Sequence, residues 1–163
     1  MTVTHPTSSS SHRSWLRADP RTTIAWIALY LGAASLVISG LDHLNQYYAN
    51  DYRTVPKIGV LFLLNFVSAV VVAVGLIAPI GRVAGRSTDA IRALLALAGI
   101  GIAVLSLAAL FVSETRGLFG FTENGYRMAI VVAIVSEVAA AVFLVVYLVA
   151  SWPRLRTMWQ RRQ

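Results

Sequence analysis

The 163-residue chain contains no cysteine and few charged residues, and both shortages narrow its class. Without cysteine, disulfides and thiolate metal sites are excluded. Only 13% of the residues are charged and 57% are hydrophobic, whereas a soluble domain of this size needs far more charge on its surface. We therefore expect lipid to be the solvent for most of the chain.

The sequence also lacks the short motifs of common catalytic chemistries. It has no glycine-rich phosphate loop after a strand, no nucleophile elbow and no HExxH metal motif. The stretch GIGIAVLS follows no predicted strand, so it indicates close helix packing rather than nucleotide binding. These absences favour a role without chemistry of its own, with no catalytic residue, cofactor or metal expected.

Four long apolar runs are present, each near the roughly 20 residues needed to cross a hydrocarbon core about 30 Å thick. A lipid-exposed backbone must satisfy its own hydrogen bonds, so each run predicts a helix. The expected fold class is all-α, a bundle of four transmembrane helices. The apolar runs are Thr23–Leu41, Ile58–Ile80, Ala93–Val112 and Met128–Ala150.

The predicted helices form one transmembrane domain over residues 23–151. A serine- and threonine-rich segment, 1–22, predicts a disordered amino-terminal arm, and 152–163 forms a basic tail that follows Pro153. The first run is longer than the apolar core of about 7–15 residues in a signal peptide, and no small-x-small cleavage site follows it, so we expect a retained helix. The helices are expected at about 23–41, 58–80, 91–113 and 128–150.

Lysine and arginine are unevenly distributed between the connections. The two terminal segments and the connection between the second and third helices hold ten of them, and the other two connections hold four. The positive-inside rule then places both termini in the cytoplasm, and we expect a multi-pass protein of the plasma membrane. The net charge of +7 fits attraction to anionic lipid at that leaflet better than nucleic-acid binding.

Polar residues are rare inside the four runs, where Glu137 is the only ionisable residue and Asn65 the only amide. A central charge costs about 2.5–3.5 kcal/mol on insertion scales, so both side chains should face protein or water. At 1.5 Å per residue they lie at depths of about 14 and 11 Å, where they can meet. Ser68, Ser106 and Ser136 complete the candidate polar intramembrane site.

Two interpretations of this polar site stay open. In the first it holds a small molecule, an ion or a proton, with Glu137 as a charge or as a neutral hydrogen-bond donor. In the second a protonated Glu137 bonds Asn65 and nearby serines only to hold helices together. Ser35 and Ser39 of the first run fall in the same outer half of the membrane.

The first outward connection carries Asp42 and His43, the latter being the only histidine outside the amino-terminal arm. One histidine beside one acid is a weak metal signal because metal sites need three or four ligands, and a bis-histidine haem needs a second histidine. The favoured interpretation is that acidic side chains surround an entrance to the bundle, or that His43 packs within the loop.

The second outward connection, SETRGLFGFTENGYR, is unusually dense in charge, glycine and aromatics. Opposite charges can neutralise the turn, glycines permit tight conformations, and phenylalanines can re-enter the membrane interface. We expect this connection to form a lid above Asn65 and Glu137. The lid would cover either a bound ligand or a set of polar contacts that only hold the helices together. Its candidate residues are Glu114, Arg116, Gly117, Phe119, Gly120, Phe121 and Glu123.

Two stretches carry a resemblance to a known family. VPKIGVLFLLN (Val55–Asn65) and GLFGFTE (Gly117–Glu123), together with SEVAAAVFL in the last run, resemble a family of uncharacterised small four-helix integral membrane proteins of actinobacteria. The resemblance covers about Gly40–Leu148. The resemblance implies a membrane location and a four-helix architecture. It implies no particular activity.

Three function classes follow from these observations. The favoured one is a non-enzymatic accessory or scaffold protein that binds a partner membrane protein or a lipid through its outer half. The second is a small transporter or proton-coupled carrier centred on Glu137. The third is an enzyme subunit that handles a quinone or lipid through Asp42, His43 and Glu137. Besides the lipid bilayer, the expected partners are a membrane protein or a second copy of this chain, and no nucleic acid.

Overall fold

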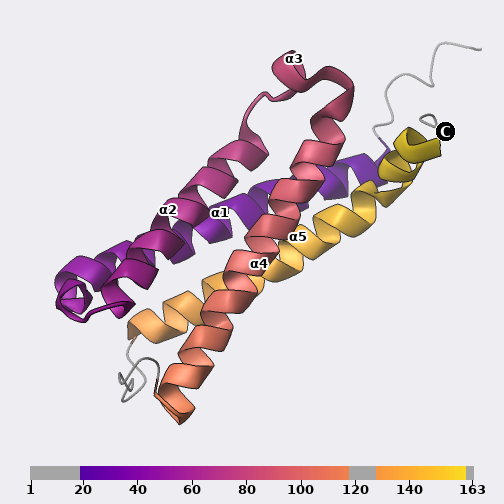
Figure 1. Ribbon diagram of the computed structural model, residues 1–163. Helices are drawn as coiled ribbons and strands as arrows, with labels where there is room; N and C mark the ends of the chain where they lie inside the picture. Colours follow the sequence, from indigo (N-terminus) through magenta and orange to yellow (C-terminus); the bar gives the residue numbers. More distant parts are fainter. Residues whose placement is uncertain (1–18, 118–127, 161–163) are drawn as a thin grey trace, which may run out of the picture.

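The computed structural model describes residues 19–117 and 128–160, and this part of the chain is almost entirely helical, without strands (Figure 1). All four long helices are long and apolar enough to cross a membrane. The all-α four-helix fold class is thereby confirmed. The long helices are α1 (Pro20–Ala49), α2 (Ile58–Ile77), α4 (Thr88–Thr115) and α5 (Met128–Gln160), and the short ones are η2 (Tyr52–Thr54), α3 (Gly81–Ala84) and η3 (Gly85–Ser87).

Large apolar side chains cover the outside of the bundle, as expected of helices that face lipid. Leu64 on α2 is 55% exposed and Leu105 on α4 is 71% exposed, and valines on α5 such as Val135 and Val142 also point outward. Water would solvate such a surface poorly. The surface is compatible with a multi-pass integral membrane protein in a lipid bilayer.

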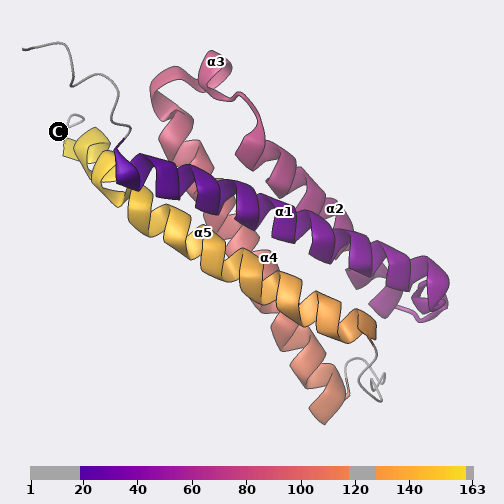
Figure 2. The same ribbon diagram turned by 180° about the vertical axis from the view of Figure 1, so that it is seen from behind.

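Helix α1 is the central element of the bundle. It packs along α5 on one side and along α2 on the other, while α4 packs against α5 and α2. In Figure 2, α1 and α5 run side by side over most of their lengths. Half of the apolar span of α1 is buried, a larger share than in the other three helices. Polar residues on α1 are therefore well placed to lie inside the protein.

The two ends of the bundle carry different connections. One end, here called the Tyr52 end, holds the connection between α1 and α2, residues 50–57. The opposite end, called the Gly85 end, holds the connection between α2 and α4, residues 78–87, together with the start of α1 and the end of α5 (Figure 1). Towards the Tyr52 end the last turns of α4 diverge from α2 in both views.

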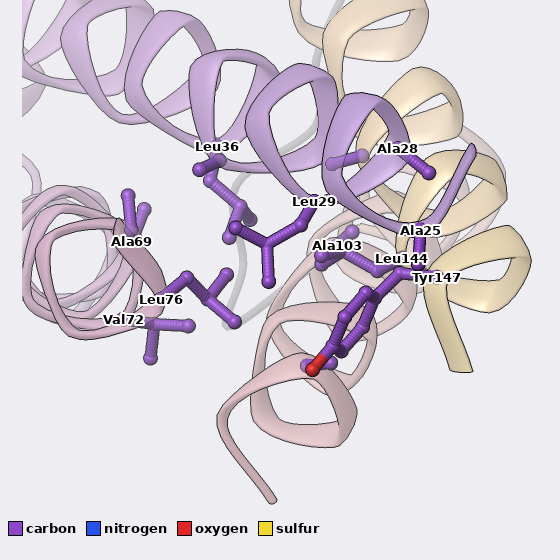
Figure 3. Close-up of a cluster of buried hydrophobic side chains, with 14 residues drawn as sticks. Ala25, Ala28, Leu29, Leu36, Ala69, Val72, Leu76, Ala103, Leu144 and Tyr147 are labelled. Atoms are coloured by element: carbon purple, nitrogen blue, oxygen red, sulfur yellow. The ribbon is translucent and has the colours of Figure 1, made fainter. Parts of the chain in front are cut away.

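The half of the bundle near the Gly85 end is closely packed. Leu144 of α5 is fully buried, and it fits between Gly32 of α1 and Gly99 of α4. A Cβ on either glycine would lie 2.7 Å from a methyl group of Leu144, closer than van der Waals contact allows, so only glycine permits this approach. Figure 3 shows Leu144 within the buried apolar cluster, beside side chains such as Leu29 and Leu36.

Helix α1 extends beyond the predicted limit of 41. It continues to Ala49 because no proline or glycine follows Gly40 until Pro56. Asp42 and His43 therefore lie on a helix, and their assignment to an outward loop was wrong. Helix α2 ends at Ile77, short of 80, because Ala78 precedes Pro79 and adopts an extended conformation.

Helices α4 and α5 are also longer than predicted. Helix α4 runs to Thr115 and so includes Glu114. Helix α5 passes through Pro153 and ends at Gln160, because a proline removes one backbone donor without ending every helix that contains it. The first residues of the tail 152–163 thus continue α5. Most of the predicted arm 1–22 lies outside the described residues.

Candidate functional site

Glu137 of α5 is 1% exposed and faces the polar side of α1. The Ser39 hydroxyl donates a hydrogen bond to Glu137 Oε1 at 3.2 Å. His43 lies one helical turn further along α1, with Nε2 3.8 Å from the same carboxyl oxygen. The buried carboxyl group therefore has polar partners on α1, which reduce the cost of removing it from water.

His43 links three helices through its two ring nitrogens. Nδ1 lies 2.9 Å from the backbone oxygen of Ser39, and a carbonyl oxygen only accepts, so Nδ1 carries a proton. In the neutral ring Nε2 is then an acceptor, and the Ser106 hydroxyl of α4, 3.2 Å away, donates to it. Glu137, Ser39, His43 and Ser106 thus form one polar cluster shared by α1, α4 and α5.

A cavity of about 290 Å³ adjoins this cluster in the half of the bundle near the Tyr52 end. Its volume is close to the lower limit of about 300 Å³ for small-molecule sites. All four long helices and η2 contribute to its walls. The described residues that line it are Asp42, His43, Gln46, Tyr52, Ile58, Leu61, Phe62, Leu64, Asn65, Ser68, Ile102, Leu105, Ser106, Ala109, Leu110, Ser113, Ala129, Ile130, Ala133 and Glu137.

The cavity has a polar wall and an apolar wall. Helix α1 supplies polar side chains, with Glu137 beside them, whereas α2 and α4 supply mainly leucine, isoleucine and alanine. Leu64 and Leu105 line the cavity and are also exposed on the outside of the bundle. The cavity is therefore bordered by exposed apolar side chains of α2 and α4, two helices whose ends diverge towards the Tyr52 end (Figure 1).

Two polar atoms at the cavity have no hydrogen-bond partner among the described residues. They are Asn65 Oδ1 on α2 and Ser113 Oγ on α4, and both are buried. Ser113 as a whole is only 6% exposed. A buried polar atom left unpaired costs about 1–3 kcal/mol. A bound molecule would recover part of that cost if either side chain turned to present its oxygen to the cavity.

The structure brings most of the predicted polar intramembrane site around one space. Glu137 and Ser106 belong to the polar cluster, and Asn65 and Ser68 line the cavity from α2. The expected hydrogen bond between Glu137 and Asn65 is absent from the described residues, because α1 lies next to α5 and supplies Ser39 instead.

Ser136 does not belong with these residues, although it is buried and adjacent to Glu137. Its hydroxyl donates to the backbone oxygen of Ala133 at 3.0 Å, within its own helix. Neighbouring positions on a helix point about 100° apart, so Ser136 is turned away from the cavity wall that Glu137 forms. Ser136 is therefore not among the described residues that line the cavity.

The predicted lid is only partly within the described chain. Glu114 lies in the last turn of α4, the N–H of Arg116 bonds Val112 as the helix ends, and Gly117 takes a positive φ of 74° that glycine readily adopts. None of these three lines the cavity. Phe119, Gly120, Phe121 and Glu123 lie outside the described residues, so the lid stays a prediction.

Sequence reasoning missed Gln46 as a cavity residue, and one pattern along α1 would have found it. Ser35, Ser39, His43 and Gln46 are all buried on α1, and their spacings of four, four and three residues place them on one helical face. Because the first helix was predicted to end at residue 41, Ser35 and Ser39 were assigned to a helix and His43 and Gln46 to a loop. Tyr52, in the connection that follows α1, is buried and packs against Phe62.

The described residues contain no group of three or more histidine, aspartate or glutamate side chains placed to hold a metal ion. Comparisons with protein-family models, with curated proteins and with solved structures gave no match to this chain.

Proposed function

We propose that this protein binds a small amphipathic molecule, taken from the membrane, in the cavity beside Glu137. The observation that carries the proposal is the division of the cavity into a polar wall around Glu137 and His43 and an apolar wall from α2 and α4. Such a space suits a ligand with one polar end and an apolar body. The protein would then act as a membrane-embedded binding or accessory protein.

A purely structural role for the polar cluster explains less of the geometry. A polar joint between helices needs its groups to be paired and the surrounding space to be filled. Here the cluster borders about 290 Å³ of space, and Asn65 Oδ1 and Ser113 Oγ have no hydrogen-bond partner in the described part of the chain. These features support a site that is completed by a ligand.

The exposed apolar residues of the cavity lining support entry from the lipid rather than from water. Leu64 on α2 and Leu105 on α4 line the cavity and are exposed, so an apolar ligand would lose little by passing between them. With both termini in the cytoplasm, as the arginine distribution predicts, the Tyr52 end lies in the outer leaflet of the plasma membrane. The ligand would come from that leaflet.

A cavity-filling variant tests the proposal. Ala109 on α4 lines the cavity, whereas the adjacent Ala108 is exposed and does not. Ala109→Phe should lower the amount of small molecule that co-purifies with the protein, and the binding of an apolar fluorescent probe, by at least about tenfold. Ala108→Phe should leave both unchanged. Equal binding by a folded Ala109→Phe variant would overturn the proposal.

A proton-coupled carrier is the second candidate, favoured by one observation. Glu137 and His43 are two proton-exchanging groups with 3.8 Å between Oε1 and Nε2, and both line the cavity. Ligand binding near such a pair can be coupled to gain or loss of a proton. In reconstituted vesicles a carrier would move protons together with ligand, and Glu137→Gln would abolish that movement. A protein that only binds would show no ligand-dependent proton flux.

A further inference from the structure

We infer that the cavity selects apolar molecules that carry a protonated amine. This inference rests on the proposed function, because it assigns a chemical class to the ligand of the same cavity. It is carried by three features of the described lining: the signs of its charges, a pair of aromatic rings, and two buried oxygen acceptors.

The charged groups of the described lining favour a cation over an anion. The lining includes two acids, Asp42 and Glu137, and contains no lysine or arginine. His43 is its one basic side chain, and its Nε2 already faces Glu137 and Ser106. An anionic head group, such as a fatty-acid carboxylate or a phosphate, would meet two acids without a free cationic partner. A cation beside an ionised carboxylate forms a neutral pair, which makes burial less costly.

Aromatic rings also line the cavity, and one of them lies beside His43. Tyr52 and Phe62 are stacked, with 4.7 Å between ring centroids and 10° between ring planes, and both line the cavity. Phe62 also lies 5.0 Å from the His43 ring. The face of an aromatic ring attracts a cation within about 6 Å. An ammonium group beside His43 would therefore lie near the Phe62 ring as well as the Glu137 carboxyl group.

The two unpaired atoms of the cavity complete a set suited to N–H donors. Asn65 Oδ1 accepts hydrogen bonds, and the Ser113 hydroxyl can accept as well as donate. They stand on α2 and α4, across from the polar stripe of α1 (residues 35–46). A protonated amine has up to three N–H groups and accepts none, so it can pair with a carboxylate and an unpaired oxygen together. A ligand that only accepts hydrogen bonds would leave Asn65 Oδ1 unpaired.

Three probes that share one apolar body separate the alternatives. They are a naphthyl-alkyl amine, its uncharged N-acetyl derivative and the carboxylate of the same length, each titrated by fluorescence into the full-length protein in detergent. We expect the amine to bind at least about tenfold more tightly than the N-acetyl probe, and the carboxylate to bind most weakly. Equal binding of amine and N-acetyl probe, or tightest binding of the carboxylate, would overturn the inference and leave the proposed function standing.

Variants locate the effect within the cavity. Asp42→Asn should weaken amine binding by about fivefold to tenfold and leave binding of the N-acetyl probe unchanged. Asp51→Asn is the matched control, since Asp51 is exposed and outside the lining. An Asp42→Asn variant that is folded and binds the amine as tightly as the native protein would count against the inference. If Ala109→Phe changes the binding of none of the three probes, the proposed function itself fails.

Discussion

Ser39 and Glu137 stand 98 residues apart in the sequence, yet the Ser39 hydroxyl donates to the Glu137 carboxyl group inside the bundle. The bond joins the first and last long helices at the level of the cavity. It also keeps the carboxyl group directed towards α1 and His43. One contact thus contributes to helix packing and positions the most buried acid of the described chain.

Glu137→Leu should destabilise the protein by about 1–3 kcal/mol, because the Ser39 hydroxyl would lose its buried acceptor. Glu137→Gln should cost less, since its amide oxygen still accepts from Ser39. Thermal unfolding of the detergent-solubilised protein measures both effects. Val138→Leu, on the exposed side of the same helix, is the control and should change little. A fully stable Glu137→Leu variant would show that Ser39 and His43 do not depend on this carboxyl group.

His43 should carry its proton on Nδ1 when the ring is neutral, because Nδ1 faces the Ser39 carbonyl oxygen. Nitrogen NMR of a protein labelled on histidine would report this tautomer directly. Ser106→Ala should shift the Nε2 signal, since the serine hydroxyl donates to that nitrogen. A dominant Nε2–H tautomer, or a Ser106→Ala spectrum identical to the native one, would contradict this geometry.

Gly99→Leu should be strongly destabilising, by about 1–3 kcal/mol or more, because the new side chain would overlap Leu144 and Leu36. Gly101→Leu provides a matched control two residues along α4, where an added Cβ meets nothing within 4 Å. Unfolding temperatures of the two variants should therefore differ clearly. Equal tolerance at both positions would mean that α4 does not approach α5 as closely as Gly99 allows.

The absence of native cysteine makes the orientation in the membrane directly testable. Asn50→Cys places a thiol at the Tyr52 end, and Gly81→Cys places one at the Gly85 end. In intact cells an impermeant thiol reagent should label the first and spare the second, because ten of the fourteen lysines and arginines lie in the segments of the second side. The reverse pattern would place the Tyr52 end in the cytoplasm.

The number and nature of the long helices were predictable because the hydrocarbon core sets the length of an apolar run. The residues at which the helices begin and end were less predictable. Helix α1 continues through Asp42 and His43 because polar residues at a helix end are compatible with helix as long as protein or water pairs them. A count of apolar residues detects where lipid contact stops and does not detect where hydrogen bonding of the backbone stops.

The sequence predicted where the polar site lies, but it did not predict which residue forms a hydrogen bond with Glu137. Glu137 attracts attention because an ionisable residue is costly in lipid, and that cost says nothing about which helix supplies the partner. Asn65 and Ser39 were both at suitable depths, and the choice between them depends on which helices adjoin. Helix α1 lies against α5, so Ser39 became the partner and Asn65 was left facing the cavity.

The close fit of Leu144 between Gly32 and Gly99 also limits the passage of molecules through the bundle from one face of the membrane to the other. Ile102 lines the cavity and also packs against the buried apolar cluster that contains Leu144. Delivery of a molecule past this cluster to the opposite face of the membrane would require its side chains or helices to move apart. Storage or exchange within one leaflet requires no such rearrangement.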